Sequence, residues 1–248
     1  PVVGTITHPT CSVATGSVAF SSLPATGTWT LTRNPGGVTQ TGTGASYTLT
    51  GVPAGTHTFT VTNANGCTSA ATANVVVNTQ PAIPTAPVTG TVTQPTCAVT
   101  TGSVGISGLP SSGTWTLTRN PGGTEVTGTG TAFTVGGITQ GTYTFTVTND
   151  AGCISPASGA ITVNAPLPVP AVPMQSVNCD GGFNHAVITV TSPAGAGNEY
   201  RLNSGAWQTN NIFSEVANGN YTVSVRNTAG CTTTGALFSV NCGCVNPP

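Results

Sequence analysis

Apolar and polar residues alternate along many short stretches of this 248-residue chain. Tyr143, Phe145 and Val147 are separated by single threonines, and Trp115 and Leu117 alternate with threonines in the same way. Alternation with a period of two is typical of a β-strand that buries one face. No stretch has the 3.6-residue period of an amphipathic helix, so the pattern predicts an all-β protein.

Turn signals divide these stretches. They include Leu109-Pro110, the Asn-Pro-Gly-Gly segment 120–123, the Gly-Gly pair 136–137 and segment 149–152, and each contains residues that favour tight turns. About seven short strands, with turns roughly every 8–12 residues, are typical of a Greek-key or Ig-like β-sandwich.

The chain contains an internal repeat. Shifting the sequence by 86 residues places Cys11 on Cys97 and Cys67 on Cys153, and 40 of the 68 residues from Cys11 onward are identical without a gap. A third copy is more divergent, but a 13-residue pattern that ends at Cys153 in the second copy recurs in it and ends at Cys231. A period of this length is too long for a solenoid repeat and fits a complete domain.

Proline-rich segments separate the copies and set the expected domain boundaries. Such segments favour the extended polyproline II conformation and act as semi-rigid spacers. We therefore expect Ig-like repeat 1 (1–80), a linker (81–87), Ig-like repeat 2 (88–165), a second linker (166–173) and a divergent repeat 3 (174–248).

Charged residues make up only 4% of the chain, and lysine is absent. A chain without a basic stripe is a poor ligand for nucleic acid or anionic lipid. No run of 18 apolar residues occurs, so no membrane insertion is predicted for this segment. The 49 threonines supply polar surface that suits strands.

Eight cysteines recur at regular positions, which indicates disulfides and an oxidising, extracellular setting. Zinc sites need cysteine or histidine in close pairs, and the two cysteines expected to pair in each repeat lie more than 50 residues apart, so no metal site is predicted. The simplest pairing lies within each repeat and joins Cys11 to Cys67, Cys97 to Cys153 and Cys179 to Cys231.

Cys242 and Cys244 break the two-cysteine pattern. In one interpretation, one or both complete a variant set of disulfides within repeat 3, whose four cysteines allow three connectivities. In the other, they bond a following domain or a neighbouring subunit.

No catalytic residue and no cofactor are predicted. A site used by the repeat should recur in it, yet His57 becomes Tyr143, and Glu125 corresponds to Thr39. No triad, spaced carboxylate pair or phosphate-binding loop is present, and the Gly-Thr-Gly segments 42–44 and 128–130 are interpreted as turn glycines without the third glycine of a dinucleotide site. A small site at His185, beside Asp180 and Phe183, is the one exception considered.

Three residues are candidates for ligand contact. Arg33 and Arg119 are the only charged residues that repeat. Their stems either pack on the aromatic core while the guanidinium caps the sandwich, or the groups reach a ligand from a loop tip. Trp207 is the one Trp outside the repeated core position, and it either packs within repeat 3 or forms a platform for a polysaccharide.

These motifs carry a family resemblance. The Pro-Thr-Cys opening, the segment 27–37 (Gly-Thr-Trp-Thr-Leu-Thr-Arg-Asn-Pro-Gly-Gly) and the ending Gly-Thr-Tyr-Thr-Phe-Thr-Val-Thr-Asn-x-x-Gly-Cys resemble repeats of very long Bacteroidota surface proteins. Repeat 3, with segment 200–207 (Tyr-Arg-Leu-Asn-Ser-Gly-Ala-Trp), is similar to the SprB-type repeat of gliding-motility adhesins. The resemblance implies an Ig-like fold, secretion by a type IX-like route and display at the cell surface or in the matrix. The Cys-Gly-Cys segment 242–244 departs from this pattern.

Three functions remain open from the sequence. The first is a non-catalytic cell-surface adhesin or its stalk, which would contact surface polysaccharide, other cells or solid surfaces. The second is a subunit of an extracellular filament that binds copies of itself, because Thr-rich strand edges with few charges are poorly protected against pairing. The third is a carbohydrate-binding accessory module that uses Trp207.

Overall fold

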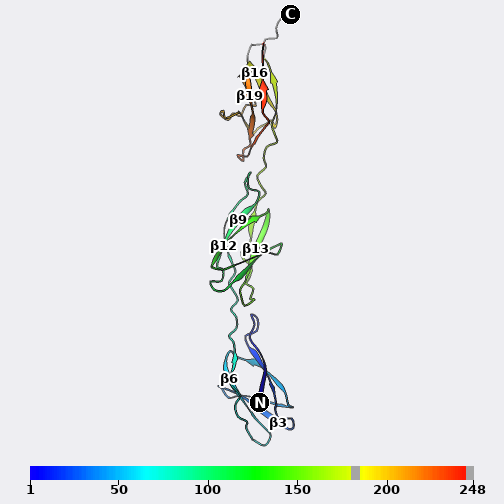
Figure 1. Ribbon diagram of the computed structural model, residues 1–248, viewed down its shortest axis with the longest axis vertical. Coiled ribbons are helices and arrows are strands. Elements are labelled where there is room, and N and C mark those ends of the chain that lie inside the picture. Colours follow the sequence, from blue (N-terminus) through cyan, green and yellow to red (C-terminus); the bar gives the residue numbers. More distant parts are fainter. Residues whose placement is uncertain (180–184, 244–248) are drawn as a thin grey trace. The chain divides into compact units, whose positions relative to one another are not determined.

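The computed structural model describes residues 1–179 and 185–243 and contains β-strands but no helix in that part of the chain, which confirms the all-β prediction. These residues form two compact units, and several of their strands are labelled in Figure 1. The first comprises Pro1–Thr89, Ile106–Phe133 and Tyr143–Ala160. The second comprises Gly90–Gly105, Thr134–Thr142 and the chain from Ile161 onward, so repeat 2 contributes to both.

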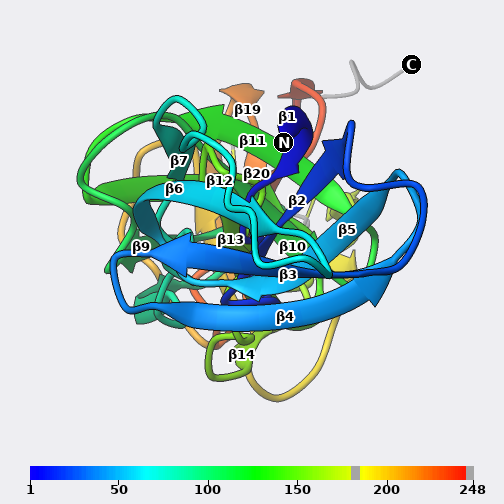
Figure 2. The same cartoon turned by 90° about the horizontal axis from the view of Figure 1, so that it is seen from below.

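Repeat 1 forms an antiparallel sandwich of seven strands, as expected for an Ig-like Greek-key fold. Three strands form one sheet and four form the other, and the chain passes between the sheets several times. Figure 2 shows β3 and β4 running side by side in the second sheet. The first sheet, in spatial order, is β1 (Val2–Thr7), β2 (Gly16–Ser21) and β5 (Tyr47–Val52); the second is β4 (Val38–Thr43), β3 (Thr28–Asn34), β6 (Gly55–Thr62) and β7 (Val75–Val77).

Alternate residues of both sheets meet in one core. Trp29 and Leu31 of β3 are buried beside Phe59 of β6, and Phe20 of β2 meets the Phe59 ring edge-on at 4.8 Å between centroids. Burying each such side chain stabilises the fold by about 1.5–3 kcal/mol. The intervening threonines face outward, so the period of two in the sequence reflects the two faces of each sheet.

Gly42 lies inside strand β4 and provides room for the Trp29 ring, so its interpretation as a turn residue was wrong. The two residues are paired across β3 and β4, and a Cβ atom at position 42 would lie 2.4 Å from Trp29 Cη2. The indole N–H of Trp29 donates to the Gly44 carbonyl over 2.9 Å. Gly128 lies in the same way against Trp115.

We expect Gly42→Ala to lower the free energy of unfolding of repeat 1 by about 1–3 kcal/mol, the range for overpacking a core. The ring of Trp29 is only 1% exposed and has no room to retreat. Thermal unfolding followed by Trp fluorescence measures the loss. Gly4→Ala is the matched control, because its added Cβ would meet nothing closer than 3.5 Å. Equal midpoints for the two variants would contradict the packing role of Gly42.

Repeat 2 has the same two strand orders as repeat 1, displaced by 86 residues. The pairing of Leu117 with Val147 across β10 and β13 repeats that of Leu31 with Val61 across β3 and β6. One sheet is β12 (Ala132–Ile138), β9 (Gly102–Ser107) and β8 (Val88–Thr93); the other is β11 (Thr124–Gly128), β10 (Trp115–Asn120), β13 (Gly141–Thr148) and β14 (Ile161–Val163).

Repeat 3 is also built of antiparallel strands, in sheets of three, three and two strands. Tyr200 lies fully inside one buried cluster and donates its hydroxyl to the Pro193 carbonyl over 3.0 Å. The sheets are β15 (Met174–Asn178), β16 (His185–Ser192) and β18 (Ile212–Ala217); β17 (Glu199–Leu202), β20 (Val223–Arg226) and β21 (Thr232–Thr234); and β19 (Gly219–Tyr221) with β22 (Phe238–Val240).

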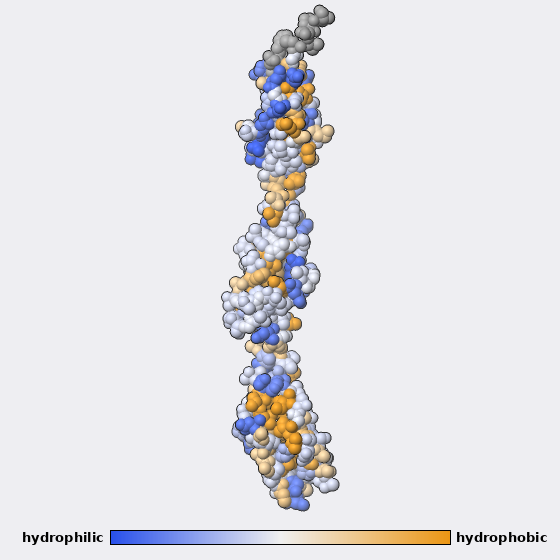
Figure 3. Space-filling view, viewed as in Figure 1, coloured by the Kyte–Doolittle hydropathy of each residue, from blue (hydrophilic) through white to orange (hydrophobic). Residues whose placement is uncertain are grey.

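The molecular surface reflects the scarcity of charge. Most of the face in Figure 3 is pale, as expected where Thr, Ser and Gly dominate, with smaller orange and blue patches. Apolar side chains such as Val2, Val76 and Val88 are more than half exposed on short or terminal strands. No helix long and apolar enough to cross a bilayer occurs among the residues that the structure describes.

Candidate functional site: disulfide-bonded joints between repeats

Three turns of the same conformation, residues 63–67, 149–153 and 227–231, end in a cysteine. In each turn the side-chain oxygen of the asparagine accepts the backbone N–H of the cysteine, over 2.9, 2.9 and 3.0 Å respectively. The asparagine N–H donates to the cysteine carbonyl over 3.0, 3.1 and 3.1 Å. The glycine before the cysteine has a φ of 82°, 79° and 82°, where other residues are strained. We call these the closing turns.

A second kind of turn carries the first cysteine of repeats 1 and 2. Each turn connects the first two strands of its repeat, and its threonine N–H donates to a valine carbonyl, from Thr10 to Val13 over 3.0 Å and from Thr96 to Val99 over 2.8 Å. We call residues 10–13 and 96–99 the opening turns.

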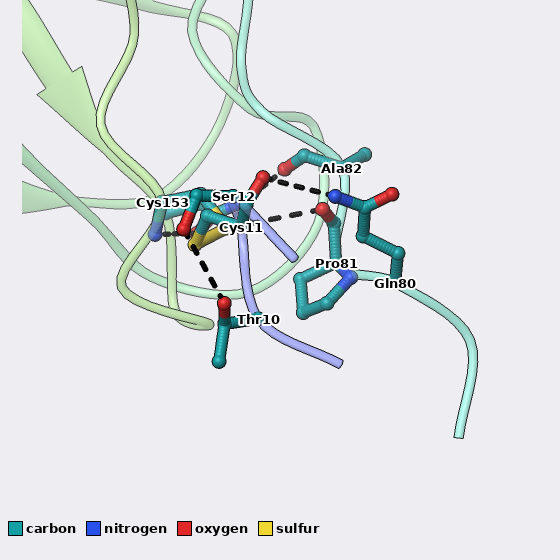
Figure 4. The surroundings of a disulfide bond; sticks show 8 residues. Thr10, Cys11, Ser12, Gln80, Pro81, Ala82 and Cys153 are labelled. Carbon is teal, nitrogen blue, oxygen red and sulfur yellow. Dashed lines mark hydrogen bonds between the residues drawn. A yellow bond between two sulfur atoms is a disulfide. The ribbon is translucent and has the colours of Figure 1, made fainter. Parts of the chain in front are cut away.

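The opening turn of repeat 1 is disulfide-bonded to the closing turn of repeat 2. Cys11 and Cys153 are joined with their Cα atoms 5.4 Å apart, a separation typical of disulfides. Figure 4 shows the linker lying against this bond, where Gln80 donates its side-chain N–H to the Cys11 carbonyl over 3.0 Å. Asn149 of the closing turn donates its amide to the Ala82 carbonyl over 2.9 Å. Opening turn, linker and closing turn together form a joint.

The joint recurs between repeats 2 and 3. Cys97 is bonded to Cys231 with their Cα atoms 5.5 Å apart. Asn227 donates its amide to the Pro168 carbonyl over 2.8 Å, and Pro168 lies 86 residues after Ala82. Both bonded closing-turn cysteines are buried, at 0% exposure for Cys153 and 1% for Cys231.

The expected pairing of Cys11 with Cys67, Cys97 with Cys153 and Cys179 with Cys231 is therefore wrong. The geometry of repeat 1 gives the reason, because β6 begins beside Val77, where the chain leaves the repeat, and the Cys67 turn follows its other end. Seven residue steps of strand span about 23 Å, whereas the Cα atoms of a disulfide lie within about 7 Å. Cys11 lies at the exit end, as its contact with Gln80 shows.

Cys179 is bonded to Cys242 within repeat 3. Cys242 therefore belongs to a variant set of disulfides inside the repeat, as in the first of the two interpretations drawn from the sequence. Cys242 is 4% exposed in the core, and its N–H donates to the Asn218 side-chain oxygen over 2.6 Å. Cys244 lies outside the described residues. Disulfides persist in oxidising compartments, so these bonds are those of an extracellular protein.

Cys67 is unpaired and exposed, although its turn has the same hydrogen bonds as the two bonded closing turns. It is the one unpaired cysteine among the residues that the structure describes. The amide nitrogen of Asn63, which corresponds to the linker-binding nitrogens of Asn149 and Asn227, has no partner in the described chain.

Arg33 and Arg119 are half-buried at the ends of β3 and β10. The guanidinium of Arg119 lies 5.0 Å from the centroid of the Tyr143 ring and donates to the Thr124 hydroxyl over 3.1 Å. The Nε atoms of both arginines are buried and unpaired in the described structure. Arg33 and Arg119 occupy equivalent places in different repeats, and neither lines the pockets beside segments 195–200, 82–85 and 185–187.

Trp207 lies over the outer face of β17 and β20 in repeat 3. The guanidinium groups of Arg201 and Arg226 lie 4.5 Å and 4.6 Å from its ring, which are cation–π distances. Arg226 also forms an ion pair with Glu199, donating from Nε over 2.9 Å. The sequence indicated Trp207 as a candidate, but it gave no sign that Arg201 and Arg226 lie over the Trp207 ring.

Each of the three histidines forms a hydrogen bond with a backbone group. His57 is 6% exposed and bonds the Pro53 carbonyl through Nε2 over 2.9 Å. His8 Nδ1 accepts the Asn78 N–H over 3.2 Å, and Gln94 makes the equivalent contact in repeat 2. His185 bonds the Glu215 carbonyl, while its neighbours Asp180 and Phe183 lie outside the described residues. Among the residues described, no group of three His, Cys, Asp or Glu side chains is placed to hold a metal ion.

A joint of this kind holds two repeats by two covalent connections, the linker and the disulfide. The asparagine of the closing turn adds a hydrogen bond to the linker. The hydrogen bonds of the closing-turn asparagines were not predicted from the sequence, although an asparagine lies four residues before the cysteine in all three repeats.

No family model matches the chain, and no curated protein matches it either. Similar solved structures include the FN1–FN3 domains of chicken CNTN1, at 13% identity over 96% of each chain and a TM-score of 0.29. A marsupial T cell receptor matches at 11% identity over 95% of this chain and 99% of the other, with a TM-score of 0.41. FdeC, an Escherichia coli adhesin, matches at 13% identity over 94% and 98% of the chains, with a TM-score of 0.28. Likenesses this distant carry no argument about function.

Proposed function

We propose that this chain is a stalk segment of a non-catalytic extracellular adhesin, a stalk that holds a binding tip away from the cell. The observation that carries the proposal is the disulfide that joins successive repeats beside each linker. A module that only bound a ligand would gain nothing from a second covalent connection to its neighbour. A stalk under tension gains mechanical strength from this connection, because its joints then resist extension without relying on non-covalent contacts.

The resemblance to SprB-type repeats supports a finer proposal, namely display on the surface of a Bacteroidota cell after type IX-like export. The tip of such a protein would contact surface polysaccharide, other cells or solid surfaces. The few charged residues of this segment suit a spacer that does not itself attract ions or nucleic acid.

A filament subunit is the second candidate function, and the exposed thiol of Cys67 favours it. Denaturing electrophoresis of surface material from the producing cells separates the two functions. For a stalk, we expect a polypeptide of several hundred kDa that survives reduction and is cleaved when protease is added to intact cells. A band near the 24.4 kDa of this chain after reduction would overturn the stalk and support the filament.

A further inference from the structure

We infer that Cys67 is the docking site for the opening turn of another repeat of this kind, which precedes repeat 1 and forms a third joint with it. The inference concerns a partner of repeat 1 and does not depend on whether the whole protein is an adhesin.

The first support is the shape of the closing turn. All three closing turns share the asparagine-to-cysteine hydrogen bonds and the left-handed glycine. In two of them the cysteine is bonded to the opening turn of the preceding repeat and is buried by it. The turn of Cys67 has this conformation without the partner, so its conformation does not depend on the bond and is ready to receive one.

The second support is independent of the sulfur. Asn149 and Asn227 each use the second end of their amide to bind a linker carbonyl, at Ala82 and Pro168. Asn63 has the same orientation, fixed by the hydrogen bonds from Cys67 and Asn65 to its oxygen. Its amide N–H groups are therefore free to bind a carbonyl of the linker that an incoming repeat would bring. The opening turn of the same repeat would supply the thiol for Cys67.

A second copy of this chain offers no free opening-turn cysteine among its described residues. Its opening cysteines Cys11 and Cys97 are already bonded to Cys153 and Cys231, and Cys179 is bonded inside repeat 3. Each described opening cysteine is therefore occupied. The occupant of the Cys67 site is the opening turn of a repeat outside these 248 residues.

The bond forms by thiol–disulfide exchange. A small disulfide such as oxidised glutathione first reacts with one of the two protein thiols and releases one reduced glutathione. The other protein thiolate then attacks the resulting mixed disulfide and expels the second reduced glutathione. The two cysteines lose two protons and two electrons, and the small disulfide takes up both.

Peptide mapping of the native protein under non-reducing conditions gives the first test. We expect the Cys67 peptide to be linked to a cysteine in an opening turn that lies outside residues 1–248. A free Cys67 thiol, a Cys67–Cys67 bond or a Cys67–Cys11 bond would each overturn the inference. A stalk would remain tenable after any of these outcomes, because the electrophoretic mass tests it separately.

A test with the chain itself uses Cys67→Ser/Cys153→Ser as the probe, because this double variant leaves the opening thiol of Cys11 unpaired. Mixed with the wild-type chain in a glutathione buffer, it should form a 1:1 product linked through Cys67 and the probe's Cys11. The matched control is Cys67→Ser/Thr68→Cys, which moves the exposed thiol by one residue, and we expect it to react at least about tenfold more slowly. Equal rates would overturn the docking site, and an intact Cys97–Cys231 bond in the probe shows that it has folded.

Discussion

Pulled from its two ends, the oxidised chain is expected to extend to only about a fifth of the length of the reduced chain. The bond between Cys11 and Cys153 removes residues 12–152 from the path that carries the force, and the bond between Cys179 and Cys242 removes residues 180–241. The shortest covalent path consists of residues 1–11, 153–179 and 242–248, which are 45 of the 248 residues. At about 3.6 Å per extended residue, the limiting lengths are about 160 Å for the oxidised chain and about 890 Å for the reduced chain.

Single-molecule force spectroscopy with handles at both ends, with and without reductant, measures both limits. The Cys11→Ser/Cys153→Ser variant serves as a control, because its shortest path runs through the Cys97–Cys231 bond and holds 115 residues, or about 410 Å. Disulfides within each repeat would instead leave a path of 87 residues, or about 310 Å. That length for the oxidised wild type would contradict the inter-repeat pairing.

Removing the first joint's disulfide with the same double variant is expected to lower the free energy of unfolding by up to about 5 kcal/mol. This is the chain-entropy value for a closed loop of about 142 residues, and it is comparable with the whole stability of a small domain. Calorimetry of the oxidised proteins measures the loss as a lower unfolding midpoint.

Cys67→Ser is the matched control for this loss, since it makes the same chemical change in an equivalent closing turn that carries no bond. We expect its midpoint to match that of the wild type, because exposed substitutions usually change stability by less than about 0.5 kcal/mol. If Cys67→Ser were as destabilising as the double variant, Cys67 would be paired within repeat 1, and the joint would be refuted.

The strands were predictable because their signal is local. The alternation of Trp115 and Leu117 with threonines records which face of β10 is buried, and the turns at Asn120 and Asn149 lie where the sequence placed them. The role of Gly42 was not predictable, because its contact with Trp29 is not local and is made between two paired strands. A glycine in a strand and a glycine in a turn look alike until that pairing is known.

The disulfide pairing was not predictable from spacing. Regular spacing shows that Cys11 and Cys67 belong to one repeat, but it does not show at which end of the sandwich each one lies. That depends on the direction of β6 and on the turn that each cysteine occupies, both of which follow from the topology. The asparagines of the closing turns were visible in the sequence, yet the role of Asn149 and Asn227 depends on linkers 67 and 59 residues away.

The pairing also sets an order for maturation of the chain. Cys67 is the nearest cysteine to Cys11, 56 residues away, whereas its actual partner lies 142 residues away. In an unfolded chain the shorter loop costs less entropy to close, so early oxidation favours the incorrect pair. Once β6 has formed, its length of about 23 Å separates the two ends of the sandwich at which these cysteines lie. We therefore expect the strands of repeat 1 to form before its cysteines are oxidised, so that oxidation locks an arrangement that folding has already selected.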